Sequence, residues 1–282
     1  NTGGSYDPVK RRDKATVATN SGLKDSVNTG GAKIYGKVMT GAGGTVHSGN
    51  GSIIGDLPWH AAHSSGGIDP NAISDDFNLE LGTVIAPFTS GFAPEQNVTT
   101  NGVTYDYVLE TGDYKIASPL IFKGNVLVRG KARLYISYDS SLNFGGTDLL
   151  EIAPGATLEV YNASPTASIG GQGLANNSVA RNFTYFGLPT NTKFTVSGNG
   201  TFVGSIYAPS AAVTLSGGGS TVKDFSGAIV AKSVVFNGTY NFHFDEDLSR
   251  DRYRNFVATS WEEIGTNWDG ILAGNLNLNT LQ

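Results

Sequence analysis

The feature that most constrains the fold of this sequence is a short pattern that returns 23 residues later. Gly204–Ala208 (GSIYA) is echoed by Gly227–Ala231 (GAIVA), and between them lie short apolar runs closed by glycine, asparagine or proline. Within these runs apolar and polar residues mostly alternate, as in strands with one buried face. A repeat of strands and turns at about 20 to 25 residues is typical of a β-solenoid. We therefore predict an all-β protein, a right-handed parallel β-helix.

A second pair of repeats lies earlier in the chain. Val126–Ile136 is matched by Leu150–Val160 at an offset of 24 residues, which places Leu134 beside Leu158. Matching at a constant offset predicts two successive rungs of one coil, because each rung of a solenoid packs against its neighbours. This pattern favours a solenoid over a two-sheet sandwich.

Three regions are expected along the chain. Residues 1–29 are mixed and polar and are interpreted as an N-terminal extension. Residues 30–247 carry the strand pattern and form the predicted β-helix domain, with loop insertions near 58–78 and 162–181 where the pattern breaks. Residues 248–282 are interpreted as a C-terminal cap and tail.

Composition limits the class of protein. The 282 residues include 38 glycines and 39% apolar residues, enough for a packed core, while the charged fraction of 15% is below the usual share of about 25%. A net charge of −5 argues against nucleic acid, which requires a basic face. The absence of cysteine excludes disulfides and thiolate chemistry, and no apolar run is long enough for a membrane span.

These properties favour an extracellular bacterial protein. The surface is expected to be rich in hydroxyl and amide groups rather than in charges, because the charged fraction is low. The sequence begins at Asn1 rather than at methionine, so we expect that a segment preceding it was removed.

Several motifs carry a resemblance to known proteins. Gly204–Pro209, Gly227–Val234 and Asn241–Glu246 form a series of a G-x-I-x-A-P rung, a G-A-x-V-A-K-S rung and a closing F-H-x-D-E strand. In this the chain resembles uncharacterised bacterial surface proteins, whose β-helical domain follows a pilin-like or secretion anchor, and the choice-of-anchor extracellular proteins. The likeness spans about residues 15–265. It implies export and a structural or adhesive role, without a reaction.

The densest acidic group is Asp245, Glu246 and Asp247, with His243 beside it. On a strand, Asp245 and Asp247 would share one face at about 7 Å, a separation that permits glycoside hydrolysis or Ca²⁺ binding. The alternative, which we favour, is a charged cap that closes the coil. No nucleophile, zinc or phosphate-binding motif occurs. The sequence thus predicts no catalytic, cofactor or metal residues and no enzyme; the alternative is a glycan depolymerase that uses Asp245 and Asp247.

Two further groups of residues invite a binding role. His60 and His63 are three residues apart and could share a metal, although packing around Trp59 is the favoured interpretation. Trp59, Tyr105 and Tyr107 are candidates for stacking on a polysaccharide. Ordinary packing of these three rings is the favoured alternative.

The C-terminal tail predicts a partner. In Leu276–Leu281 (LNLNTL) leucine alternates with polar residues, as in a strand that seeks a sheet edge. Because a solenoid has open edges at both ends, we expect self-association of the chain into an extracellular filament or surface layer. The alternative is a monomer whose tails fold back on its own coil.

Overall fold

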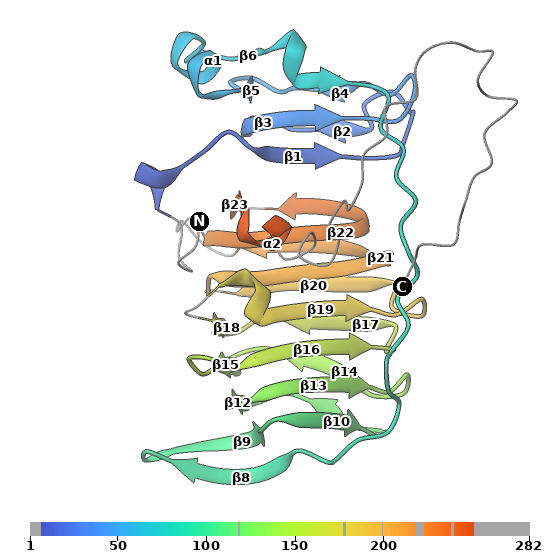
Figure 1. The fold of residues 1–282 in the computed structure, drawn as a ribbon, viewed down its shortest axis with the longest axis vertical. Helices are drawn as coiled ribbons and strands as arrows, with labels where there is room; N and C mark the ends of the chain where they lie inside the picture. The colour runs from blue at the N-terminus through green and yellow to red at the C-terminus, as the bar shows by residue number, and fades with distance from the viewer. Residues whose placement is uncertain are drawn as a thin grey trace, which may run out of the picture.

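The computed structural model describes residues 7–117, 119–176, 179–198, 200–217, 223–237 and 240–250. These residues form a parallel β-solenoid of about 10 turns, which confirms the predicted β-helix (Figure 1). The strands lie in two stacks. We call residues 15–74 the N-terminal stack and residues 95–244 the main stack.

The N-terminal stack is small, with one five-stranded and one two-stranded parallel sheet. Its core consists of Val38, Ile54 and Ala72, against which partly buried aliphatic side chains pack. Its elements, with the short helix that precedes them, are η1 (Pro8–Lys10), β1 (Ala15–Ala18), β2 (Val27–Asn28), β3 (Lys33–Met39), β4 (Val46–His47), β5 (Ile53–Gly55), α1 (Leu57–Ala62), β6 (Gly67–Ile68), η2 (Pro70–Ala72) and β7 (Ile73–Ser74).

The main stack has three faces. The earlier turns contribute one short strand to each face, whereas the long strands β21 and β22 each run along two faces. Among its described strands, β8 and β9 alone pair antiparallel, as a hairpin that closes the lower end in Figure 1. Its elements are β8 (Glu95–Thr100), β9 (Val103–Leu109), β10 (Gly112–Ile116), β11 (Ile121–Phe122), β12 (Asn125–Val128), β13 (Lys131–Ile136), β14 (Ser141–Phe144), β15 (Leu149–Ile152), β16 (Thr157–Asn162), β17 (Thr166–Ile169), β18 (Gly173–Asn176), η3 (Ala180–Asn182), β19 (Phe183–Gly187), β20 (Lys193–Gly198), β21 (Phe202–Gly217), β22 (Lys223–Asn237), β23 (Tyr240–Phe244) and α2 (Asp247–Arg250).

The two glycines of the opening repeat occupy one position of successive rungs. Gly204 pairs with Gly227 and Ile206 with Ile229, at the predicted offset. Gly227 has a φ of 154°, and a Cβ there would overlap the carbonyl oxygen of Gly204. A Cβ on Gly204 would in turn press on the ring of Phe183. Glycine recurs here because the backbones approach too closely for a side chain.

The offset between rungs is not constant. Val126 pairs with Leu150, as predicted, but Leu134 pairs with Val160 rather than with Leu158, so that prediction is wrong. The reason is the corner between β15 and β16, which has two more residues than the corner between β12 and β13. The length of a corner therefore changes the number of residues between paired positions of neighbouring rungs. The alternation of inward and outward side chains along each strand stays the same.

Three expected boundaries differ from the structure. Residues 15–18, placed in the extension, form β1 and pair in parallel with β3. The segment 58–78 contains β6 and β7, which pair with β5 and β3, and 162–181 contains β17 and β18, which pair with β14 and β15. Both segments are therefore rungs rather than insertions. In 58–78 the strands have only two residues each, too few to show an alternation. In 162–181 the buried positions include polar residues, namely Asn162, Ser164 and Asn176, which an apolar pattern does not show.

A connector, residues 75–92, joins the two stacks and runs along the outside of the main stack (Figure 1). It leaves the N-terminal stack where Leu79 and Asn20 exchange two hydrogen bonds. It then passes Tyr207, whose hydroxyl donates to the carbonyl oxygen of Gly82 at 2.7 Å, and ends at Phe92, which bridges to β10. The first strands of the main stack therefore lie far from the N-terminal stack, and its successive rungs approach the N-terminal stack in chain order.

A buried polar cluster lies inside the main stack. The Tyr185 hydroxyl accepts from Asn162 Nδ2 and donates to Asn191 Oδ1, both at 2.9 Å, and Asn191 Nδ2 donates to the carbonyl oxygen of Ser164. Burial raises the pKa of Tyr185, so its hydroxyl remains a donor. These side chains satisfy backbone and amide groups at a corner that apolar side chains would leave unpaired.

Replacing Tyr185 with phenylalanine is expected to lower the free energy of unfolding by about 1–3 kcal/mol, because two buried amide groups lose a partner. Chemical denaturation of the full chain measures this shift. Tyr138→Phe is the control, since Tyr138 is 55% exposed and should tolerate the change. Equal stability of the two variants would contradict a stabilising role for the cluster.

Candidate functional site

The C-terminal end of the main stack exposes residues that belong to the core. The rings of Phe202, Phe225 and Phe242 stack on successive rungs, with centroids 4.6 and 5.1 Å apart. Phe225 is fully buried, whereas Phe242 in the last strand is 36% exposed. The ring ladder thus reaches the surface where the rungs end.

The second half of β22 is uncovered in the same way. Val234 and Phe236 pair with Val213 and Leu215, which are fully buried, yet Phe236 is 46% exposed. Val235, which points outward, is exposed to a similar degree. Among the described residues, β23 pairs with β22 and is the last strand of this sheet. We call Val234, Val235, Phe236 and Phe242 the end surface.

The N-terminal stack lies beyond the end surface (Figure 1). Its nearest sheet edge is β1, which pairs only with β3 in the described part of the chain. An ion pair of 3.7 Å between Arg12 and Glu246 links the two sides. The strands β1 and β23 therefore both lie at this junction.

The acidic group lies at the same end, but not on a strand. β23 ends at Phe244; the buried Asp245 follows, and its carboxylate accepts the backbone N–H of Asp247 at 3.1 Å. Asp247 begins α2 and lies 3.5 Å from Arg181. The expectation that Asp245 and Asp247 share a strand face is wrong, because the chain turns between them. The arrangement is that of a charged cap, and His243 points outward to Asp224 at 2.9 Å.

The two histidines of the N-terminal stack contact different rings. His63 stacks on Trp59 at 3.7 Å, as the packing interpretation predicts. His60 instead stacks on Tyr35 at 3.7 Å, and its Nε2 donates to the carbonyl oxygen of Ile34. No group of three or more His, Cys, Asp or Glu residues suited to a metal ion occurs in the described residues.

The three candidate stacking aromatics do not form one surface. Trp59 belongs to the N-terminal stack, whereas Tyr105 and Tyr107 lie on β9. The Tyr105 hydroxyl donates to Glu151 at 3.0 Å, and burial together with this carboxylate raises the pKa of Tyr105. Tyr107 packs on Phe122 with centroids 4.8 Å apart. Trp59 and Tyr107 thus contact neighbouring rings, whereas Tyr105 is held by a hydrogen bond to Glu151.

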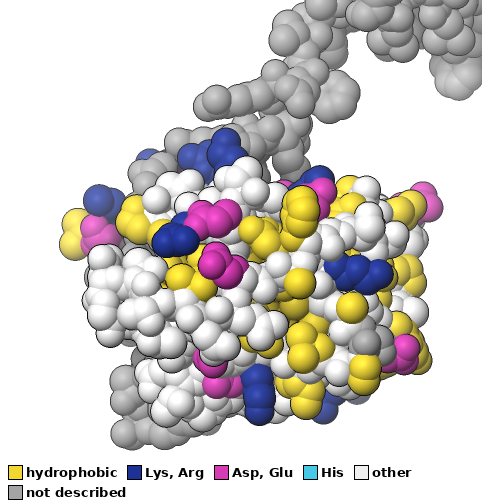
Figure 2. Space-filling view, turned by 90° about the horizontal axis from the view of Figure 1, so that it is seen from below, with side chains coloured by type: hydrophobic (Ala, Val, Ile, Leu, Met, Phe, Trp, Pro, Cys, Tyr) yellow, Lys and Arg dark blue, Asp and Glu magenta, His cyan; other side chains and the backbone are white. Residues whose placement is uncertain are grey.

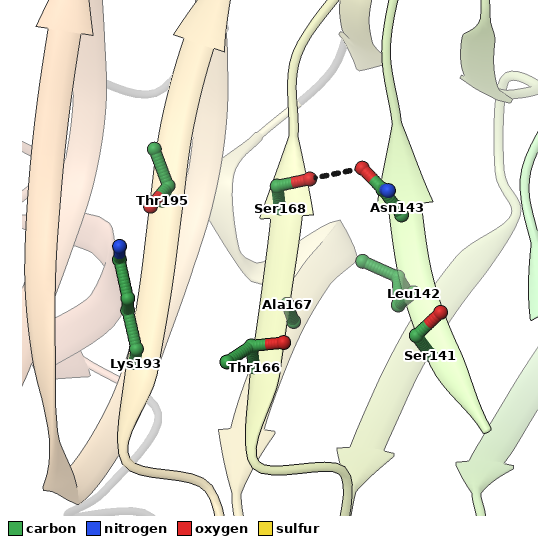
Figure 3. Close-up of a pocket in the computed structure, with 8 residues that line it drawn as sticks. All are labelled: Ser141, Leu142, Asn143, Thr166, Ala167, Ser168, Lys193 and Thr195. Atoms are coloured by element: carbon green, nitrogen blue, oxygen red, sulfur yellow. Dashed lines mark hydrogen bonds between the residues drawn. The ribbon is translucent and has the colours of Figure 1, made fainter. Parts of the chain in front are cut away.

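A shallow groove crosses the outer face of β14, β17 and β20 (Figure 3). Asn143, Ser168 and Thr195 lie in one row, since they pair in register, and Thr166 and Lys193 lie in the next. The groove has a volume of about 320 Å³, and Ser168 donates to Asn143 at 2.6 Å. Sequence reasoning missed this site, although the register of the repeats would have aligned its rows.

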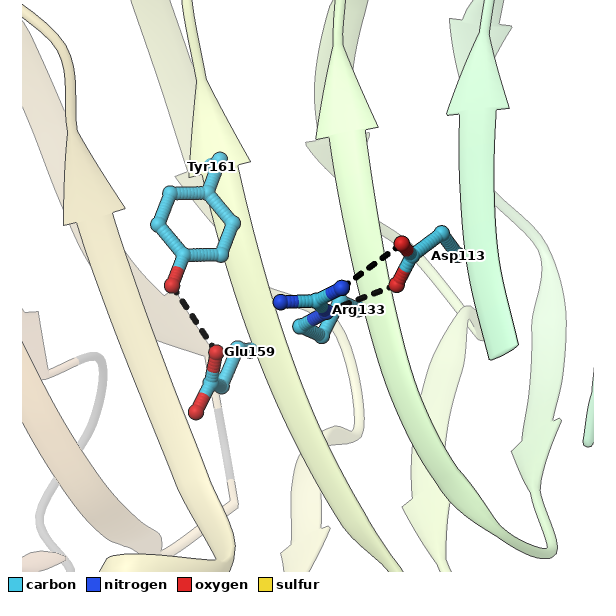
Figure 4. Close-up of polar contacts among 4 residues, drawn as sticks. All are labelled: Asp113, Arg133, Glu159 and Tyr161. Carbon is cyan, nitrogen blue, oxygen red and sulfur yellow. Dashed lines mark hydrogen bonds and ion pairs between the residues drawn. The ribbon is translucent and has the colours of Figure 1, made fainter. Parts of the chain in front are cut away.

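A row of charged and aromatic side chains lies on β10, β13 and β16 (Figure 4). The connector contacts this row through Phe88. Arg133 donates two hydrogen bonds of 2.6 Å to Asp113, and the Tyr161 hydroxyl donates to Glu159 at 2.8 Å. Burial, together with Glu159, raises the pKa of Tyr161. Phe88 of the connector packs edge-on against Tyr161. The guanidinium of Arg133 lies 5.0 Å from the ring centre of Phe88. This row anchors the connector.

The described residues define the protein as a parallel β-solenoid whose last described rung exposes core positions. Residues 93–251, more than half of the chain, match the family described as a domain of unknown function, DUF7305, and the chain belongs to that family. The match covers the main stack and its end surface. No curated protein and no solved structure matches the chain. In the described residues, no helix is long and apolar enough to span a bilayer.

Replacing Phe88 with alanine is expected to loosen the connector, because Phe88 contacts Tyr135, Tyr161 and Arg133. Limited proteolysis should then cut residues 77–92 several times faster than in the parent chain. Ile85→Ala is the matched control, since Ile85 is 82% exposed. Equal cleavage rates for the two variants would show that Phe88 does not hold the connector.

Proposed function

We propose that this protein is a secreted bacterial cell-surface structural protein, a subunit of an extracellular filament or surface layer with an adhesive role. The observation that carries the proposal is the end surface, where the inward positions Val234, Phe236 and Phe242 of the last described rungs are exposed. Exposed apolar side chains at the end of a sheet favour pairing with another chain. The proposal assigns no reaction to the chain.

The two ends of the main stack differ in a way that supports this role. At the hairpin end, the edge strand β8 reads Glu-Gln-Asn-Val-Thr-Thr, and polar side chains of this kind protect a sheet edge from pairing. Figure 2, viewed from that side, shows charged side chains among apolar and uncharged ones. At the opposite end, β22 presents Val-Val-Phe without such protection.

The sequence supports the extracellular setting. The chain has no cysteine and few charges, and its motifs resemble those of bacterial surface proteins. Strand pairing would supply a durable contact without disulfides, because main-chain hydrogen bonds and side-chain packing form together.

Replacing Phe236 with serine should weaken self-association about tenfold, because it removes apolar area equivalent to about 1.4 kcal/mol from the contact. Light scattering and electron microscopy over a concentration series give the measurement. Ile121→Ser is the matched control, since Ile121 is a strand residue with 52% exposure elsewhere on the main stack. A parent chain that stays monomeric at high concentration would refute the proposal.

A second candidate function is polysaccharide binding in the groove of β14, β17 and β20. The groove displays hydroxyl and amide groups in register, and Lys193 is the cation among its lining residues. Side chains of this kind hydrogen-bond sugar hydroxyls, and the lysine favours an acidic polysaccharide.

Replacing Lys193 with glutamine is expected to weaken the binding of an acidic polysaccharide such as polygalacturonate about threefold to tenfold, and to leave binding to neutral dextran unchanged. Affinity electrophoresis compares the two polymers. The control is Lys131→Gln, because Lys131 is an exposed strand lysine outside the groove. An equal loss of binding affinity in the two variants would mean that the effect comes from net charge rather than from the groove, and would contradict this candidate function.

A further inference from the structure

The strands that carry the groove differ in charge from the rest of the main stack. We call the outer side of five successive segments the groove face: β14, β17, β20, residues 212–217 of β21 and residues 233–237 of β22. None of these five segments contains aspartate or glutamate. The other two faces carry carboxylates on their strands, namely Asp113, Glu151 and Glu159. The groove face therefore presents no strand carboxylate that would repel an anion.

The polar side chains of the groove face are also less engaged with one another than those of the neighbouring face. On that neighbouring face Arg133 bonds to Asp113, and the hydroxyls of Thr184 and Ser205 lie 3.0 Å apart. On the groove face Ser168 donates to Asn143. No described residue bonds to the side chains of five other polar residues there: Ser141, Thr166, Lys193, Thr195 and Thr214. Their donors are open to a ligand.

The register of the strands places part of these groups in a row along the stack axis. Asn143, Ser168, Thr195 and Thr214 pair in turn on four successive rungs, and the exposed Val235 follows Thr214 (Figure 3). Neighbouring strands lie about 4.7–4.9 Å apart, so the row is about 14 Å long. This spacing is close to the length of one sugar unit in an extended polysaccharide. The groove reaches the first three residues, and Thr214 lies one rung beyond it.

The direction along a strand offers a ligand much less. β14 and β17 have four residues each, so each strand turns only two side chains outward, as Ser141 and Asn143 do in β14. A polymer that followed one strand would pass these two side chains and then reach a corner. A polymer that crosses the strands meets a polar side chain on each of four rungs.

We infer that the groove is part of a longer track for a linear acidic polysaccharide, which lies along the stack axis with one sugar unit on each rung from Asn143 to Thr214. The inference rests on the proposed polysaccharide binding and adds the direction of the polymer, its length and Thr214 as a contact. The hydroxyl and amide groups of the row bond to sugar hydroxyls, and Lys193, beside the row, bonds to a carboxylate. The absence of strand carboxylates favours an anionic polymer over a cationic one.

Oligogalacturonates of increasing length measure the extent of the track. Their affinity for the full chain, measured by isothermal titration calorimetry, should rise with each added unit up to the tetramer and then level off. A dimer that binds as tightly as the tetramer would overturn the inference, because the ligand would then need only one or two rungs.

A lysine placed beyond the groove tests the direction of the polymer. Thr214→Lys adds a cation at the far end of the row and should tighten binding of the tetramer about twofold to fivefold, the effect of an exposed ion pair. The matched control is Thr147→Lys, which adds the same charge at the exposed corner that follows β14, in the direction of the strand. Equal gains in the two variants, or a gain in Thr147→Lys alone, would contradict a track along the axis.

The two levels of the proposal fail separately. If Lys193→Gln weakens the binding of polygalacturonate but the dimer and tetramer bind equally, the track is refuted and binding in the groove stands. If polygalacturonate does not bind to the parent chain, both are refuted.

Discussion

Parallel pairing in register places each inward side chain over its equivalent in the rung before. Phe202, Phe225 and Phe242 show what this requires, because each ring is covered by the next and only the last is exposed. Apolar burial in such a stack is therefore shared between neighbours rather than contained in one rung. A final rung built like the others must leave core positions open, and the end surface is the direct result of this constraint.

The path of the connector places the N-terminal stack beside the end surface. Because residues 75–92 carry the chain along the whole main stack before its first strand, the last strands return to the N-terminal stack. The ion pair of Arg12 with Glu246 joins residues that are far apart in the sequence. The acidic group lies where the chain turns at this junction, and the Asp245 carboxylate accepts the backbone N–H of Asp247 there.

The sequence predicted the repeat better than the boundaries. Gly204 and Gly227 fall at one position because close backbones demand glycine, a local requirement that is visible in the residues themselves. The pairing of Leu134 with Val160 depends on the length of one corner, and the pattern of apolar residues does not reveal that length. Asn162 is buried with Tyr185, and its polarity, with that of the residues after it, suggested an insertion at 162–181 where a rung exists. The groove and the end surface depend on which strands become neighbours, and sequence order alone does not state this.

The connector also gives the molecule a direction under tension. Hydrogen bonds between rungs point along the stack axis, so a pull along that axis loads every rung interface in series, and the weakest interface separates first. The connector lies on the same axis as continuous covalent backbone, held at Gly82, Phe88 and Phe92 to rungs that are far apart. A force applied between the two ends is thus shared by a peptide chain, which sets a limit on how far the rungs beside it separate.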